Sequence, residues 1–202
     1  PQRSFEVKEE KAFRLSHYGF RSVTLQGAYP ADATLKLWFP PDLYSPHRTH
    51  AELLLHMAYG AGLSPGSVIN IAINGKFRHA IALNSPQGAA FDDYKVELPL
   101  TSFAPGLNTI TFTSRPIPIE RKEACEPDYL GNLLVSIFDD STIEIPDVNH
   151  YTSLPDLGQF AHTGFPFNNL AYGKELGLYV AERSALTTAS ALALIAKMTR
   201  NR

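Results

Sequence analysis

Residues 68–83 read VINIAINGKFRHAIAL, and this stretch decides the fold class. Two segments in which apolar and other residues alternate, 68–73 and 77–83, flank the dipeptide Asn74-Gly75. A two-residue type I′ turn needs a positive φ at both of its central positions, and Asn followed by Gly tolerates this best. The stretch therefore predicts a β-hairpin.

Segments with the same period of two lie on both sides of the hairpin. Leu35, Leu37 and Phe39 alternate with polar residues until Pro40-Pro41 ends the segment. Proline also interrupts nearly every window before residue 150 that could form a helix of ordinary length. Roughly eight to ten short strands separated by Gly, Pro, Asn and Asp are typical of a β-sandwich, here a jelly roll. The further strands are expected at residues 53–57, 94–98, 107–113, 133–138 and 142–145.

The composition excludes several classes of function. The 202 residues include 18 Lys and Arg against 20 Asp and Glu, a net charge of −2. This balance gives no electrostatic basis for general binding to nucleic acids or to anionic membranes. One cysteine excludes an internal disulfide and a Cys-rich zinc site, and no apolar run reaches the ~20 residues that span a bilayer.

The distribution of proline indicates a change of architecture near the C-terminus. The chain has 15 prolines, and none follows Pro166. Residues 176–180 are expected to form a short buried strand, and Ser184 to cap a helix over 185–198. A single βα unit cannot complete a parallel sheet, so we expect a chain that stops inside a second domain. The expected division is a sandwich at 1–146, a loop-like linker at 147–175 and a truncated α/β element at 176–202.

The order of several short phrases resembles one known family. The phrases include LKLWFPPDL at 35–43, LSPGS at 63–67, IAING at 71–75, PGLNTI at 105–110, DLGQF at 156–160 and GFPF at 164–167. In this order they are similar to the periplasmic regulatory subunit of bacterial cellulose synthase. The resemblance covers most of residues 5–200. It is closest to that family's second carbohydrate-binding domain, a jelly roll, with the start of the flavodoxin-like domain that follows.

The resemblance implies a location and partners. It implies a periplasmic protein, attached to the inner membrane by an anchor outside this segment and docked on the catalytic cellulose synthase subunit. The implied role is to guide the emerging β-1,4-glucan and to support the catalytic subunit, with self-association of the parent assembly left open. A purely structural interaction module of the same complex is the alternative.

The family is also labelled as binding cyclic di-GMP, which makes a receptor for this messenger a further alternative. A PilZ-type site needs two arginines four residues apart and an Asp/Asn-x-Ser-x-x-Gly loop. No Arg-x-x-x-Arg occurs in this chain, and Asp139-Asp140-Ser141 lacks the glycine. The motifs therefore do not support this alternative.

Trp38 is the main candidate for contact with a sugar. It is the only tryptophan and lies on the polar face of its expected strand, opposite the apolar residues. An exposed indole can stack on a pyranose ring, and the neighbouring Lys36 can donate to hydroxyl groups. Tyr29, in the loop before this strand, is a second and weaker candidate. The alternative for Trp38 is packing under a loop or against a companion domain.

Other residues with chemical potential receive structural interpretations. A zinc site needs ligands in a fixed geometry, which the spacing of His47, His50 and His56 does not indicate, so no metal and no cofactor is expected. The pairs Asp92-Asp93 and Asp139-Asp140 would point to opposite faces of a strand, which disfavours glycoside hydrolysis, and no enzyme is expected. Ser184, Thr187 and Thr188 follow the expected strand without a phosphate-binding glycine and are interpreted as helix-capping residues. Cys125 is either a small buried residue or one half of a disulfide to another part of the parent protein.

Overall fold

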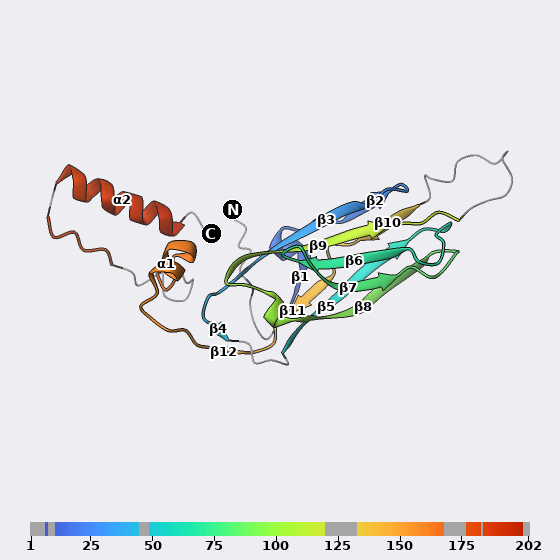
Figure 1. Cartoon of the computed structure of the whole chain (residues 1–202), viewed down its shortest axis with the longest axis horizontal. Coiled ribbons are helices and arrows are strands. Elements are labelled where there is room, and N and C mark those ends of the chain that lie inside the picture. Colours follow the sequence, from blue (N-terminus) through green and yellow to red (C-terminus); the bar gives the residue numbers. More distant parts are fainter. Residues whose placement is uncertain are drawn as a thin grey trace.

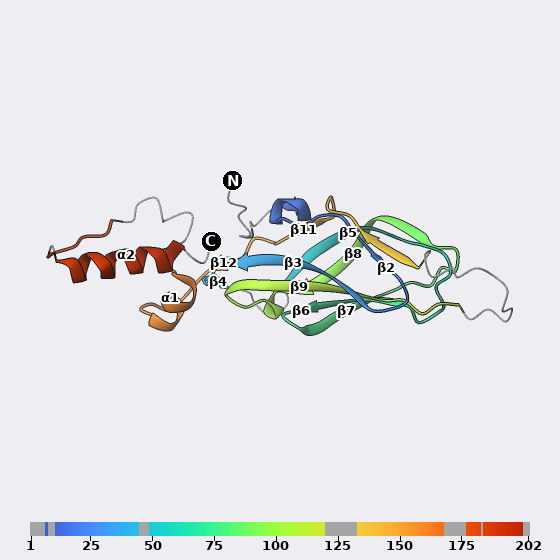
Figure 2. The same ribbon diagram turned by 90° about the horizontal axis from the view of Figure 1, so that it is seen from above.

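The computed structural model describes residues 7, 11–44, 49–119, 133–167, 177–182 and 184–199. Two antiparallel sheets face each other and form a sandwich, with two helices beyond one end (Figures 1 and 2). The predicted β-sandwich with a small helical part is therefore confirmed.

The first sheet contains four strands and includes the predicted hairpin. Its order is β3-β9-β6-β7, with every neighbouring pair antiparallel. The turn residues Asn74 and Gly75 have φ values of 51° and 76°, as a type I′ turn requires. The strands are β3 (Ala31–Phe39), β6 (Val68–Ile73), β7 (Lys76–Ala82) and β9 (Gly106–Arg115).

The second sheet contains six strands. Four of them are short and lie end to end in twos, and each two is called an interrupted pair because it follows the line of one broken strand. β10 and β11 lie end to end along the same side of β5, and β8 lies along its other side. β2 pairs with β10 and β1 with β11, so β1 and β2 also follow one another along one line. The strands are β1 (Ala12–Arg14), β2 (Val23–Gln26), β5 (His50–Tyr59), β8 (Ala89–Pro99), β10 (Leu134–Ile137) and β11 (Thr142–Glu144).

Counting each interrupted pair as one strand gives the jelly-roll order. The first and last strands, β1/β2 and β10/β11, are then neighbours in one sheet, with β5 and β8 following. The second strand, β3, lies beside the second-to-last, β9, in the other sheet, with β6 and β7 following. This interleaving of early and late strands is the double Greek key that defines a jelly roll.

The core lies between the sheets and follows the predicted alternation. Leu35, Leu37 and Phe39 are buried, whereas Lys36 between them is exposed. In β5, each alternate residue from Ala51 to Tyr59 is buried. The same rule applies to the inner residues of the other strands, which include Ile69, Ile71, Ile73, Val96, Leu98, Ile110, Phe112, Val135, Ile137 and Ile143.

The residues after the sandwich differ from the expected loop and strand. The segment 147–167 contains β12 (Asn149–His150), paired with β4 (Leu43–Tyr44), and helix α1 (Leu157–Thr163). Asp156 caps α1 by accepting a hydrogen bond from Gln159 N at 2.8 Å, and Gln159 Nε2 donates to Pro41 O at 3.1 Å. This part of the expected linker is therefore bound to the sandwich.

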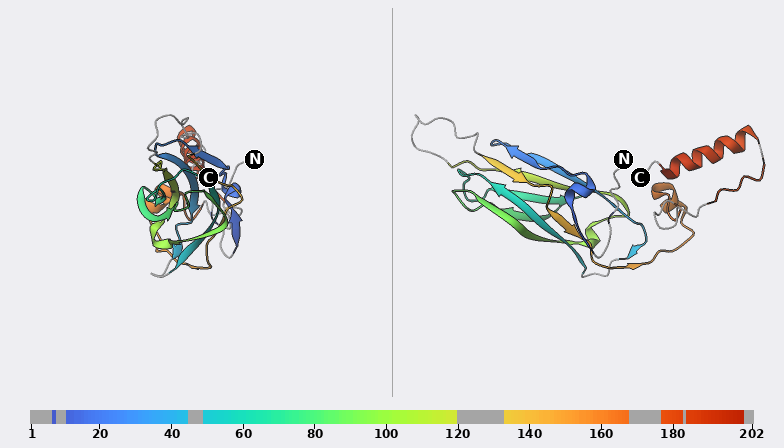
Figure 3. Two further views of the ribbon diagram at one scale, coloured as in Figure 1. Left: turned by 90° about the vertical axis from the view of Figure 1, so that its right-hand side faces the viewer. Right: turned by 180° about the vertical axis from the view of Figure 1, so that it is seen from behind.

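Helix α2 (Ala185–Thr199) confirms the predicted C-terminal helix and lies beyond α1 (Figure 3). The strand expected at 176–180 is wrong for its described part, because residues 177–180 are irregular and exposed. A strand needs a neighbour to pair its backbone groups, and residues 177–180 pair with no described strand. Two short 3₁₀ helices, Leu15–Tyr18 and Leu100–Ser102, complete the described elements. None of the described helices combines the length and the apolar character needed to cross a membrane.

Asn108 stabilises one end of the four-stranded sheet from inside the core. Its side chain is fully buried, and its Oδ1 accepts hydrogen bonds from Asn74 Nδ2 at 2.7 Å and from Ala104 N at 2.8 Å. Its Nδ2 donates to the carbonyl oxygens of Ala104 and Gly106 at 2.7 and 3.0 Å. One amide thus connects the hairpin turn to the chain entering β9.

We predict that Asn108→Ala lowers the free energy of unfolding by about 2–4 kcal/mol, because it leaves several buried polar groups without partners. The measurement is urea unfolding followed by circular dichroism. Thr109→Ala, one residue along on the outer face, is the matched control and should change stability by less than about 0.5 kcal/mol. Equal effects of the two substitutions would contradict the role assigned to Asn108.

Candidate functional site

Trp38 and Lys36 lie on the outer face of the four-stranded sheet. They are two residues apart on β3, so their side chains point to the same side. Trp38 is half-buried and Lys36 is exposed. In the β3–β9 register, Trp38 lies opposite Leu107 and Lys36 opposite Thr109. Leu107 is itself 59% exposed, so an apolar pair and a polar pair lie side by side at this end of the sheet.

A row of threonines extends this surface along β9. Thr109, Thr111 and Thr113 are outward-facing and half-buried. They lie opposite Lys36, Thr34 and Asp32 of β3. The hydroxyls of the three β9 threonines have no hydrogen-bond partner among the described residues, and Asp32 and Lys36 carry opposite charges. We call this surface, made of Asp32, Thr34, Lys36, Trp38, Leu107, Thr109, Thr111 and Thr113, the threonine face.

Tyr29 lies at the other end of the threonine face. It is 85% exposed and precedes the first residue of β3, Ala31, which pairs with Ser114. Nine residues separate Tyr29 from Trp38, or about 30 Å at the rise of an extended strand. The structure therefore brings Trp38 and Lys36 together but leaves Tyr29 too distant to contact the same sugar ring.

The histidine cluster considered in the sequence divides in the structure. His50 begins β5, and His56 lies six residues further along that strand, or about 20 Å away. His47 lies outside the described residues. Among the residues that are described, no three His, Cys, Asp or Glu side chains are placed to hold a metal ion.

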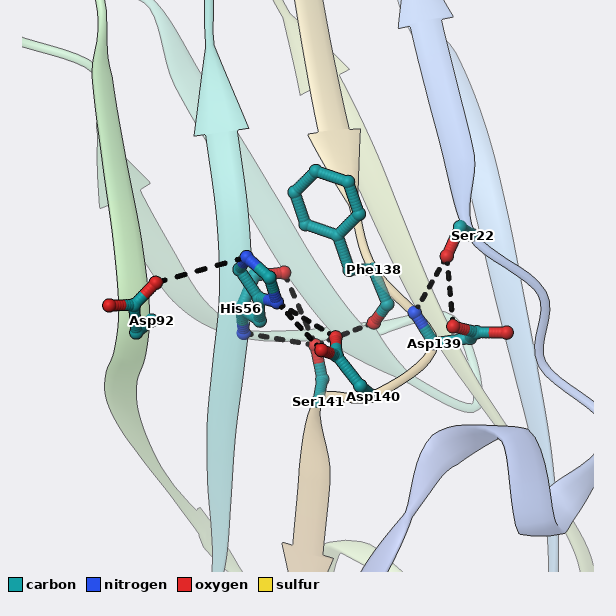
Figure 4. Close-up of polar contacts among 7 residues, drawn as sticks. All are labelled: Ser22, His56, Asp92, Phe138, Asp139, Asp140 and Ser141. Carbon is teal, nitrogen blue, oxygen red and sulfur yellow. Dashed lines mark hydrogen bonds and ion pairs between the residues drawn. The ribbon is translucent and has the colours of Figure 1, made fainter.

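His56 instead lies between two aspartates on the outer face of the six-stranded sheet (Figure 4). Its Nδ1 is 2.8 and 3.0 Å from the two carboxylate oxygens of Asp140, and its Nε2 is 3.9 Å from Asp92 Oδ1. The ring of Phe138 lies tilted against the imidazole, with 4.3 Å between the ring centroids. We call His56, Asp92, Phe138 and Asp140 the His56 cluster.

Interruptions on both sides of β5 create this cluster. On one side, β11 pairs with residues 52–54 and β10 with residues 57–59, and residues 138–141 cross between them. On the other side, Leu55 pairs with Tyr94 and Met57 with Phe91, so two aspartates of β8 lie opposite His56. Such a bulge redirects side chains locally. The bulge places Asp92 beside His56, and the break between β10 and β11 places Asp140 on the other side of the same histidine.

Ser141 replaces the missing sheet hydrogen bonds at the break. Its buried Oγ accepts a hydrogen bond from His56 N at 3.0 Å and donates to Phe138 O at 2.7 Å. Ser22 supports the same turn, because its Oγ accepts from Asp139 N and donates to Asp139 Oδ1, both at 3.0 Å. The turn that carries Asp140 is therefore held at two points.

Elsewhere on the outer face of the six-stranded sheet, one lysine lies beside two glutamates. Lys95 pairs with Glu52 across the strands and lies 3.6 Å from Glu97. The hydrogen bond to Glu52 and the two neighbouring carboxylates raise the pKa of Lys95 above its usual range. These side chains are exposed, so the pairs contribute little stability. They make this face strongly charged, in contrast to the threonine face.

The helix-capping interpretation of Ser184 is supported. Ser184 Oγ accepts a hydrogen bond from Thr187 N at 3.2 Å, and Thr187 Oγ1 donates to Glu182 O at 2.6 Å. Both hydroxyls are thus used to begin α2. Cys125 lies outside the described residues.

We predict that Ser141→Ala lowers the free energy of unfolding by about 1–3 kcal/mol, because it leaves the His56 N–H at the break without its acceptor. Thermal unfolding is the appropriate measurement. Ser136→Ala provides the control, since among the described residues the Ser136 hydroxyl bonds the Thr24 hydroxyl alone, on the outer face. If Ser136→Ala destabilises as much as Ser141→Ala, the break does not depend on Ser141.

A family profile and several curated proteins match this chain. The profile described as "Cellulose synthase BcsB, second CBM domain" matches residues 12–142. A "Cyclic di-GMP-binding protein" of Salmonella typhi is 29% identical over 161 residues, covering 72% of this chain and 21% of the relative. The protein of the same description from Escherichia coli K12 is 28% identical, with the same shares covered.

A third relative carries a different description. "Putative cellulose synthase 2" of Komagataeibacter xylinus is 27% identical over 162 residues, covering 72% of this chain and 10% of the relative. The chain thus spans about a fifth or less of the length of the curated relatives that it matches.

Proposed function

The chain belongs to the family of second CBM domains of the cellulose synthase protein BcsB, and we propose that it contacts the β-1,4-glucan as a non-catalytic part of such a synthase. The observation that carries this proposal is the threonine face. Trp38 offers part of its indole, and Lys36 and Thr109 beside it offer polar groups.

The chemistry of the threonine face fits an uncharged polymer. Half of its outward side chains carry hydroxyls, and its two charges, on Asp32 and Lys36, are opposite in sign. A glucan presents hydroxyls at the edges of its rings and C–H groups on their faces. Hydroxyls on β9 match the edges, and the apolar pair Trp38 and Leu107 matches the faces. The charged outer face of the six-stranded sheet offers a poorer match to a long neutral chain.

A weak interaction suits this role. One partly exposed indole with a few hydrogen bonds supports about −4 kcal/mol, which corresponds to a dissociation constant on the order of millimolar. A polymer held this weakly at each point can move along the surface. Tyr29, far along the same sheet, is proposed as a separate second contact for an extended chain.

We extend the proposal to location and partners on the basis of the family. The parent protein is proposed to lie in the periplasm, attached to the inner membrane by an anchor outside this segment, with the catalytic synthase subunit as its partner. Exposed apolar side chains of α2, Leu186, Leu192 and Ile195, favour a further α/β domain as the neighbour of this helix. The division into domains at residues 146 and 175 is part of the same proposal.

The relatives named as cyclic di-GMP-binding proteins do not extend that activity to this chain. The arginine pair and the glycine loop of a PilZ-type site are missing from its sequence. A purely structural role is the remaining alternative, and it predicts that the threonine face binds no sugar.

We predict that cellohexaose changes the fluorescence of Trp38 with a midpoint in the millimolar range. Lys36→Ala should weaken binding about threefold to tenfold, because one hydrogen-bonding cation is lost. Lys76→Ala removes the same charge at the hairpin turn and serves as the matched control, with no expected change in affinity. An unchanged Trp38 spectrum at tens of millimolar cellohexaose would favour the structural role instead.

A further inference from the structure

The two ring nitrogens of His56 have different surroundings. Nδ1 lies within hydrogen-bond distance of both oxygens of Asp140. A carboxylate only accepts, so Nδ1 carries the hydrogen of this contact. In the neutral ring, Nε2 is then an acceptor, and it is 3.9 Å from Asp92 Oδ1, which is beyond hydrogen-bond distance.

With the imidazole in its neutral form, Nε2 of His56 and the carboxylate of Asp92 are therefore two neighbouring acceptors without a donor between them. Neither has a hydrogen-bond partner among the described residues. Both are accessible, since the His56 side chain is 34% exposed and that of Asp92 is 97% exposed. In Figure 4 they come from neighbouring strands, with Asp140 on the other side of the imidazole. A ligand that fits this pair must bring two donors close together.

Phe138 adds an apolar surface beside the acceptors. Its ring is half-buried and packs against the imidazole of His56 at 4.3 Å. A sugar ring combines the matching features, because adjacent hydroxyls donate hydrogen bonds while the C–H groups contact an aromatic ring. The buried hydroxyl of Ser141 at the break is engaged with backbone groups of Phe138 and His56. The Ser141 hydroxyl is therefore not available as a nucleophile. The His56 cluster is arranged for binding.

We propose that His56, Asp92 and Phe138 form a saccharide-binding site on the six-stranded sheet, which holds a neutral sugar ring through two adjacent hydroxyls. Asp140 positions the imidazole and does not touch the sugar. The site lies on the opposite side of the sandwich from the threonine face. It goes beyond the proposed function of that face and does not depend on it.

The test is nuclear magnetic resonance of the whole chain with cellohexaose as the probe. Titration should shift the imidazole C–H resonances of His56, and Asp92→Ala should weaken this response about tenfold, as expected for one hydrogen bond to a charged group. Asp93→Ala removes the neighbouring charge and is the matched control, with an expected change of less than about twofold. Because the Asp92 side chain is almost fully exposed, its removal should not impair folding.

Trp38→Ala separates this site from the threonine face. In that variant the His56 response should persist, whatever happens to binding at the threonine face. Three results would overturn the proposal: no His56 shift at tens of millimolar cellohexaose, equal effects of Asp92→Ala and Asp93→Ala, or a shift produced only by a cationic glucosamine oligomer. The last result would mean that the site recognises charge rather than hydroxyl groups.

Discussion

The pairing register between β3 and β9 is the constraint on which the functional interpretation depends. Side chains alternate strictly across a sheet, so a slip of one residue would exchange the inner and outer sets. In the observed register, Leu35 lies opposite Ile110 inside, and Lys36 lies opposite Thr109 outside. Asn108 anchors the start of β9 to the neighbouring hairpin, because its buried amide bonds both the turn residue Asn74 and Gly106 at the start of β9. The threonine face exists only while this register is kept.

The two outer faces of the sandwich differ in chemistry because their sheets differ in regularity. β3 and β9 pair without interruption over nine residues, which produces a straight row of hydroxyls suited to an extended neutral chain. The pairing of β5 with its neighbours on both sides is interrupted at His56, so side chains from separate strands lie close together at this point. The regular sheet thus presents a continuous row of side chains along its strands, and the irregular sheet presents a cluster of side chains at one place.

The sequence predicted the features that depend on local rules. The alternation of Leu35, Leu37 and Phe39 with exposed residues indicated the inner face, and Asn74-Gly75 indicated the hairpin. The outward direction of Trp38 and Lys36 followed from the same alternation. Helix α1 was missed although Asp156 and Gly164 are suitable caps, because its seven residues lie in a segment rich in loop-forming residues.

Features that depend on distant partners could not be predicted. The His56 cluster requires the bulge in β8 and the break between β10 and β11. Neither can be recognised from the alternation of apolar and polar residues within one segment of the sequence. Asp139-Asp140 lies in a turn, whereas Asp92-Asp93 lies within β8, and their shared neighbour, His56, is 36 residues from Asp92 and 84 residues from Asp140. The separation of Tyr29 from Trp38 likewise became clear only from the strand register.

The central claim is that the threonine face contacts the glucan, and the most direct measurement is a map of threonine methyl resonances during titration with cellohexaose. The account predicts that the methyl groups of Thr109 and Thr111 shift together with the indole of Trp38, while that of Thr188 on helix α2, away from both proposed sites, remains unchanged. If the threonine methyls stay fixed while the sugar binds elsewhere on the chain, the account of the threonine face is wrong.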